Sequence, residues 1–216
     1  STISAILISA LEFKPGKNKV VYDDLNFPSV HYNWKAAERR GAKVHLVESP
    51  DGIHVPLERM LEAIDEETLA VPISHCLFRS SFVHDAKAIV DRAHEVGAIV
   101  ILDAYQSVGT LPIDVQDLKV DFLVGGSVKW LCGGAGAAYL YARPDLICNY
   151  EPVFTGWFSH KRPFAFEMAS IDYADDIHRF MGGSPSVPAL YAAKEGYKVI
   201  LEVGIENIRA KSLEMT

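Results

Sequence analysis

The feature that most constrains the fold is an alternation of short apolar runs with amphipathic segments of helical periodicity. Several of the apolar runs are rich in Val, Ile, Leu and Ala, which is typical of strands buried on both faces of a sheet. The alternation predicts a three-layer α/β/α fold with a mostly parallel central sheet. The expected strands are Lys19–Tyr22, Lys43–Val47, Leu69–Ile73, Ala98–Leu102, Phe122–Val124 and Ala137–Tyr141, and the expected helices are Tyr32–Arg40, Leu57–Ile64 and Val83–Val96.

The domain organisation follows from length and from a change of pattern late in the chain. A chain of 216 residues suffices for one large domain with its own core. From Glu151 to Gly183 the pattern becomes irregular and rich in Pro, Gly and aromatic residues, which in compact domains is often a functional stretch. We expect residues 1–187 to form a large domain with a truncated N-terminus. Residues 188–216 should form a helix leading toward a C-terminal small domain that is absent.

Composition narrows the classes of partner. The net charge of −7 favours neither nucleic acid nor an anionic membrane, and no apolar stretch is long enough to span a bilayer. The three cysteines are scattered, without the spacing of a zinc site or a disulfide framework. This pattern predicts a cytoplasmic protein.

Two polar side chains follow neighbouring expected strands, at the sheet edge where parallel folds bind ligands. Asp103 follows the strand Ala98–Leu102, and Lys129 follows the strand that ends before Gly125-Gly126. Taken singly, Lys129 could extend to solvent and Asp103 could cap a turn. Taken together, they match pyridoxal phosphate (PLP), which needs a lysine for a Schiff base and a carboxylate for its pyridine nitrogen. Burial of the lysine would lower its pKa and free the amine as a nucleophile.

Longer sequence blocks carry a family resemblance. The blocks Asp103–Ser107, Pro112–Val115, Asp121–Gly126, Ser127–Lys129 and Gly133-Gly134 resemble the class V aminotransferase family. That family has the fold of type I PLP enzymes and includes cysteine desulfurases, isopenicillin-N-epimerase-like proteins and kynureninases. Further blocks, which extend the resemblance over nearly the whole chain, lean toward kynureninase-like members: Asn26–Ser29, Phe78–Ser81, Gly156-Trp157 with His160, and Gly183–Pro185.

The resemblance implies roles for the residues that would contact the cofactor ring. Lys129 would form the Schiff base and then act as a proton shuttle. Asp103 would pair with the pyridinium nitrogen. Gln106 matches the glutamine that hydrogen-bonds the phenolic oxygen in desulfurase-like members, where kynureninases usually have histidine. Phe27 matches the aromatic residue that stacks on the ring, although it could also be an ordinary core residue.

The resemblance also implies a phosphate site and a substrate site. Ser80 matches a small hydroxyl residue close to the cofactor. Trp157 and Ser184 match phosphate-binding residues that come partly from the partner subunit, which implies a homodimer with shared active sites. Ser127 is a further phosphate candidate, and His160 a candidate for contact with the substrate. Trp157 could instead anchor its loop, and His160 could be an exposed loop histidine.

The chain departs from the family pattern at two positions. Val128 stands where relatives usually place a phosphate-contacting His or Tyr, and Val30 stands where kynureninases place Asp. The phosphate site would therefore depend on hydroxyls, backbone amides and a helix N-terminus, of which Ser1 and Thr2 would be a remnant. Both departures weaken a kynurenine-cleaving assignment more than the cofactor assignment.

The sequence therefore predicts a PLP-dependent enzyme of the class V group, kynureninase-like, that acts on an amino acid. It leaves open which bond of the substrate breaks. Alternatives are a desulfurase-like, epimerase-like or transaminase activity, and a domain that keeps the fold without turnover. A nicotinamide-binding domain is disfavoured because no G-x-G-x-x-G turn follows the first expected strand.

Overall fold

A single six-stranded sheet forms the centre of the computed structural model, which describes residues 1–216. Its strand order is β2-β1-β3-β4-β5-β6; β1 to β5 pair in parallel, and β6 runs antiparallel to β5. The mostly parallel sheet predicted from the sequence is thus confirmed. The strands are β1 (Lys19–Asp23), β2 (Lys43–Val47), β3 (Thr68–Ser74), β4 (Ile99–Asp103), β5 (Phe122–Gly126) and β6 (Ala138–Ala142).

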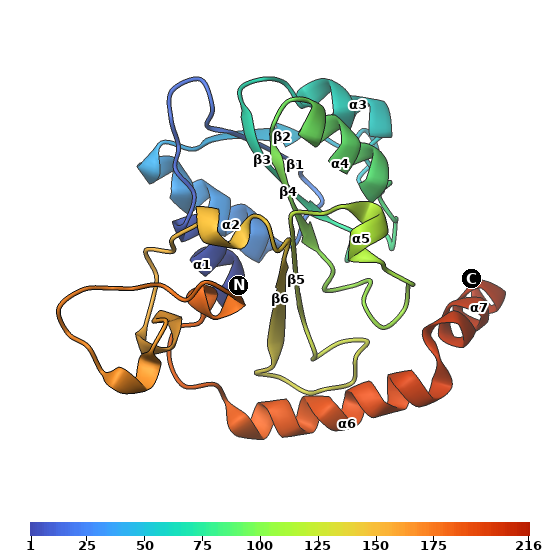
Figure 1. The fold of residues 1–216 in the computed structure, drawn as a ribbon. Coiled ribbons are helices and arrows are strands. Elements are labelled where there is room, and N and C mark those ends of the chain that lie inside the picture. Colours follow the sequence, from blue (N-terminus) through green and yellow to red (C-terminus); the bar gives the residue numbers. More distant parts are fainter.

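Helices cover both faces of the sheet, which gives the three expected layers (Figure 1). One layer contains α1 (Thr2–Ser9) and α2 (Pro28–Ala37), and the other contains α3 (Leu57–Ala63) and α4 (Ala86–Glu95). The short α5 (Val115–Leu118) follows β4 on the side of α4. The long α6 (Val187–Val203) and the terminal α7 (Ile205–Met215) lie beyond the end of β6, away from these layers.

Alternate residues of the strands divide the core into two clusters. On β3, Val71 and Ile73 pack with α3 and α4, whereas Ala70 packs with α1 and α2. The side chains of β1, β4 and β5 alternate between the two clusters in the same way, because successive side chains of a strand point to opposite faces. Burial on both faces explains why these strands appear in the sequence as continuous apolar runs.

Two helices begin elsewhere than their periodicity predicts. The expected helix Val83–Val96 begins only at Ala86, because Asp85 is its N-cap and accepts a hydrogen bond from Ala88 N. The expected helix Tyr32–Arg40 begins earlier, at Pro28, where proline suits the first helical position. It ends at Ala37, and a 3-10 turn over Glu38–Arg40 leads into Gly41, whose φ of 103° allows the chain to reverse.

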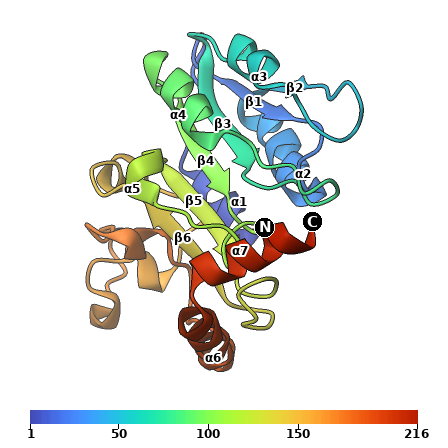
Figure 2. The ribbon, with the colours of Figure 1, turned by 90° about the vertical axis from the view of Figure 1, so that its right-hand side faces the viewer.

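The stretch between β6 and α6 is irregular, as the sequence predicts. It contains the 3-10 turns Ile147–Asn149, Trp157–Ser159, Pro163–Ala165 and Ile177–Phe180, and no longer helix. Figure 1 shows α6 below the loop between β5 and β6; in the side view of Figure 2, α6 is seen nearly end-on and α7 lies in front of the strands.

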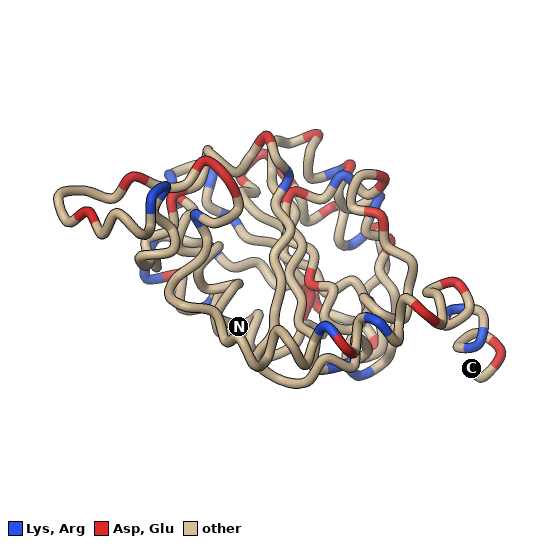
Figure 3. Tube along the Cα trace, turned by 60° about the horizontal axis from the view of Figure 1, so that its bottom comes forward, with Lys and Arg blue, Asp and Glu red and all other residues tan.

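Charged side chains are distributed along the whole chain. Acidic and basic residues are interspersed over the elements in the tube view (Figure 3). None of the helices combines the length and the apolarity that crossing a membrane would require.

Candidate active site

A cavity of about 690 Å³ lies at the carboxyl edge of the parallel strands. Its walls come from the segments that follow β1, β3, β4 and β5, from the start of α1 and from the residues that lead into α6. This is the edge at which parallel α/β folds bind ligands, because the loops after the strands converge there. All four residues predicted to contact the cofactor ring line the cavity, namely Phe27, Asp103, Gln106 and Lys129, and so do Ser1 and Thr2.

Lys129 stands in the turn that follows β5. Its Nζ atom lies 5.5 Å from the ring centroid of Phe27 and 5.1 Å from that of Tyr105. At these distances the ring faces attract the ammonium group. The turn closes on itself, because Cys132 N donates to Lys129 O at 3.0 Å and Gly133 N donates to Ser127 O at 2.7 Å. A structured turn therefore holds the lysine between two aromatic walls.

Asp103 ends β4 and faces the same cavity. The carboxylate accepts one hydrogen bond, from Tyr105 N to Oδ1 at 2.9 Å. Burial raises the pKa of Asp103 above its ordinary value, and the Tyr105 N–H and the charge of Lys129 oppose that rise. A half-buried carboxylate with so few partners suits a ligand that brings a positively charged N–H donor.

The glycine pair that ends β5 makes room for two tyrosine rings. A Cβ atom on Gly125 would collide with the ring of Tyr139, and one on Gly126 would collide with the ring of Tyr105. Because both positions lack a side chain, the Tyr105 ring can lie against β5 and form part of the cavity wall beside Lys129. The Gly pair in the sequence therefore shapes this wall.

Phe27 and Phe78 together form an aromatic part of the cavity wall. Their rings meet edge to face, with centroids 5.3 Å apart, an arrangement that aromatic pairs prefer. Gln106 also lines the cavity, and its Oε1 accepts a hydrogen bond from Trp130 Nε1 at 3.2 Å. The cavity thus combines flat apolar surfaces with a few polar groups, as cofactor sites generally do.

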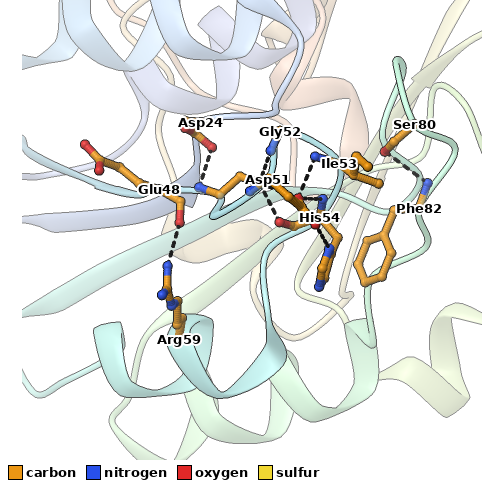
Figure 4. Close-up of polar contacts among 10 residues, drawn as sticks. Asp24, Glu48, Asp51, Gly52, Ile53, His54, Arg59, Ser80 and Phe82 are labelled. Atoms are coloured by element: carbon orange, nitrogen blue, oxygen red, sulfur yellow. Dashed lines mark hydrogen bonds and ion pairs between the residues drawn. The ribbon is translucent and has the colours of Figure 1, made fainter.

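Ser127 and Ser80 do not line the cavity. Ser127 is buried, and its Oγ is hydrogen-bonded to the Tyr197 hydroxyl of α6. Ser80 lies in the turn after β3, where its Oγ accepts a hydrogen bond from Phe82 N at 3.3 Å (Figure 4). Neither hydroxyl therefore faces the cavity of this chain.

Trp157, Ser184 and His160 also lie outside the cavity. Trp157 belongs to an aromatic cluster, with its ring centroid 5.5 Å from that of Phe164 and 5.9 Å from that of Phe166. His160 accepts a hydrogen bond from Arg162 N at its Nδ1, at 2.9 Å. Ser184 is exposed, although its neighbours Pro185 and Ser186 line the cavity.

Several cavity residues were not assigned a site role from the sequence. Among them are Ser74 at the end of β3, Cys76 just after it, Phe78 in the next turn, and Tyr105. Ser74 and Cys76 flank His75, at the end of an expected strand, so their position was the available signal. The position of the Tyr105 ring could not be predicted from the sequence, because it depends on the space left by Gly126 on another strand.

Solved structures share this architecture. A C-DES mutant with glycine covalently linked to its PLP cofactor superposes with a TM-score of 0.82 at 20% identity, covering 94% of this chain and 54% of that chain. The apo cysteine desulfurase from Thermococcus onnurineus NA1 gives a TM-score of 0.79 at 23% identity, covering 95% of this chain and 51% of that one. The fold is therefore that of the type I PLP-dependent enzymes.

Curated sequences and a family model identify the family. The uncharacterized aminotransferase YcbU of Bacillus subtilis (strain 168) is 36% identical over 194 residues, which are 90% of this chain and 50% of YcbU. The kynureninase of Pseudomonas fluorescens is 30% identical over 218 residues, 99% of this chain and 50% of the enzyme. The chain spans about half the length of these relatives. The model of the class-V aminotransferases matches residues 1–216, so the chain belongs to this family of PLP-dependent enzymes.

Proposed function

We propose that the protein is a PLP-dependent enzyme that acts on an amino acid, with Lys129 as the lysine that attaches the cofactor. The observation that carries the proposal is that Lys129 and Asp103, the two residue types that PLP requires, line one cavity together with the aromatic ring of Phe27. When bound, PLP supplies an electron sink for the pair of electrons left when a bond at the substrate α-carbon breaks.

The residues fit this cofactor on structural grounds. The pKa of Asp103 is raised by burial, so a pyridinium N–H brought by the cofactor would supply the positive partner that favours its ionised form. Phe27 offers a flat ring face to the cavity, and Gln106 a polar group. The first turn of α1 also lines the cavity with Ser1, Thr2 and Ser4, and the N–H groups of a helix N-terminus suit a phosphate.

Each residue then has a definite task. The Lys129 amine would hold the cofactor, and its Nζ atom would move a proton to or from the substrate α-carbon. The Asp103 carboxylate would hold the proton on the cofactor nitrogen, and the aromatic walls would orient the flat ring and exclude water.

Within the family we propose a kynureninase-like activity. The 30% identity to a kynureninase over almost the whole chain supports it. A cysteine desulfurase-like activity is the second candidate, because Gln106 stands where desulfurase-like members have glutamine and kynureninases usually have histidine. Assays of the full chain with kynurenine, with cysteine and with an amino donor plus a 2-oxo acid would separate hydrolase, desulfurase and transaminase activities.

We also propose a cytoplasmic homodimer with shared active sites. Trp157 and Ser184, which match phosphate-binding residues of the family, lie outside the cavity of their own chain, and the cluster around Trp157 exposes Phe164 and Phe166. A second copy would cover these rings and bring both residues to its partner's cavity. A monomeric mass in sedimentation equilibrium would contradict this proposal.

The test of the cofactor site is the Lys129→Ala variant. We expect the wild-type protein, incubated with PLP and reduced with borohydride, to carry the label on the peptide that contains Lys129. The variant should lose this label and its turnover by several orders of magnitude, because no other lysine lines the cavity. Lys194→Ala, a variant of an exposed lysine of α6, is the control. A label that persists in Lys129→Ala would contradict the assignment.

A further inference from the structure

Asn26 makes a set of buried hydrogen bonds beside the cavity that the proposed chemistry does not use. It lies in the loop after β1 and is 6% exposed. Its Oδ1 accepts hydrogen bonds from Ser74 N at 3.1 Å and from Ser74 Oγ at 2.8 Å. Its Nδ2 donates to Asp23 Oδ2 at 3.1 Å and to Asp23 O at 3.3 Å. One side chain therefore ties the end of β1 to the end of β3.

The sheet itself does not make this connection. The register between β1 and β3 contains only the pairs Lys19–Thr68 and Val20–Ala70, with a shift between them. The pairing therefore stops short of the carboxyl ends, where the cavity lies. There the side chain of Asn26 takes the place of backbone pairing and satisfies Ser74 N, which would otherwise be a buried donor without a partner.

The tie joins two parts of the cavity wall. Phe27 follows Asn26 directly and forms the aromatic wall, and Ser74 lines the cavity on the other side of the tie. Ser74 is also paired in register with Asp103 on β4. Phe27 is therefore connected to Asp103 by a peptide bond to Asn26, by the Asn26–Ser74 hydrogen bonds and by the pairing of Ser74 with Asp103.

A second contact fixes the orientation of the amide. Asp23 is fully buried and accepts a hydrogen bond from Leu25 N at 2.9 Å, and its Oδ2 lies 3.3 Å from His84 Nε2. A carboxylate accepts and a backbone N–H donates, so the Asn26 amide can satisfy both neighbours in one orientation only. Aspartate at position 26 would lack the donor and would place a second carboxylate against Asp23.

We propose that Asn26 is a positioning residue that holds Phe27 in place for the ring of the bound cofactor; this rests on the proposed PLP site. It acts through Phe27 and Ser74 and touches no reacting atom. Supporting groups of this kind determine how well a site is preorganised, because the residues that contact the ligand keep their geometry only when their own neighbours hold them.

Asn26→Ala in the full chain tests the proposal, with Asn18→Ala as the matched control. Asn18 is also buried (8% exposed) and lies at the opposite end of β1, where its Nδ2 donates to Gly41 O at 2.7 Å. We expect PLP to bind roughly tenfold more weakly to Asn26→Ala, the effect of losing a buried hydrogen-bonded support, and to change by less than about twofold in Asn18→Ala. Equal PLP dissociation constants for the two variants would overturn the proposal.

A second readout needs no cofactor. Amide hydrogen exchange over Phe27–Val30 in the PLP-free protein should accelerate in Asn26→Ala and stay unchanged in Asn18→Ala. If wild type binds no PLP, the proposed function fails, and the exchange comparison still decides whether Asn26 holds this segment. If Asn26→Ala does not fold, Ser74→Ala removes only the Oγ donor and should shift both readouts in the same direction by less; unchanged values would refute the role.

Discussion

At the scale of single residues, Asp103 is suited to ligand binding at the expense of the stability of the folded chain. This carboxylate lines the cavity and accepts one hydrogen bond, and burial raises its pKa. A raised carboxyl pKa means that ionised Asp103 destabilises the folded chain at pH values above its unfolded pKa, because the unfolded state solvates the charge better. Such local conflicts are expected where a residue serves ligand binding rather than folding.

The Asp103→Asn variant should therefore be more stable than wild type when PLP is absent. We expect the free energy of unfolding at pH 8 to rise on the order of 1 kcal/mol, because relief of a strained site commonly yields gains of this size. The same variant should lose turnover by orders of magnitude, since an amide does not hold the pyridine nitrogen protonated. Urea unfolding of the PLP-free proteins measures the first effect. A less stable variant would show that the carboxylate supports the fold.

At the scale of elements, the loop between β5 and β6 depends on a close approach by α6. A Cβ atom on Gly196, in the middle of α6, would collide with the backbone of Leu131 and Cys132, and one on Gly133 would meet Ala193. The loop that carries Lys129 therefore packs backbone to backbone against the helix. Ser127 adds a hydrogen bond to Tyr197 on the same helix.

Gly196→Ala tests this packing. Alanine in place of glycine inside a helix normally stabilises it by about 1 kcal/mol. Here we expect the opposite, a loss of about 1–3 kcal/mol typical of overpacking, together with weaker PLP binding because the Lys129 turn is displaced. Glu202→Ala, at an exposed position of the same helix, is the control and should be neutral. A stabilised Gly196→Ala variant would show that α6 does not need to approach this closely.

At the scale of the whole molecule, the buried His75 makes stability depend on pH. His75 is buried between β3 and the segment after β4, with its Nδ1 hydrogen-bonded to Ser107 Oγ at 3.1 Å. Burial, with a smaller contribution from the charge of His84, lowers the pKa of His75 to about 4. Its pKa in the unfolded chain is about 6.5.

Between pH 6.5 and 4 the unfolded chain therefore binds a proton that folded His75 does not bind. As the pH is lowered from 6.5 to 4, we expect the free energy of unfolding to decrease by up to about 3 kcal/mol because of this histidine. His75→Gln keeps a partner for Ser107 and should flatten the curve over the same window. Urea unfolding at several pH values checks this, and identical curves for variant and wild type would count against it.

Much of the fold was predictable because strand and helix periodicities are local properties of the chain. The apolar runs around Val71 and Val100 and the glycine stops at Gly41 and Gly97 are of this kind, and they led to the observed layers. Helix starts were less predictable: Asp85 starts α4 through a capping hydrogen bond, and Pro28 starts α2 through its fixed φ at the first helical position, and neither effect depends on periodicity.

For the site, the sequence by itself determined which chemistry is available: a lysine and an aspartate that end neighbouring strands, in the sequence pattern of one family. Only the tertiary structure decided which side chains share the cavity. In the folded chain, Tyr105 lies beside Lys129, Ser127 is hydrogen-bonded to Tyr197 of α6, and Asn26 links the end of β1 to the end of β3. The physical reason is that strand ends are positioned by the chain's local pattern, whereas side-chain neighbours across strands depend on the space and the hydrogen-bond partners that other elements supply.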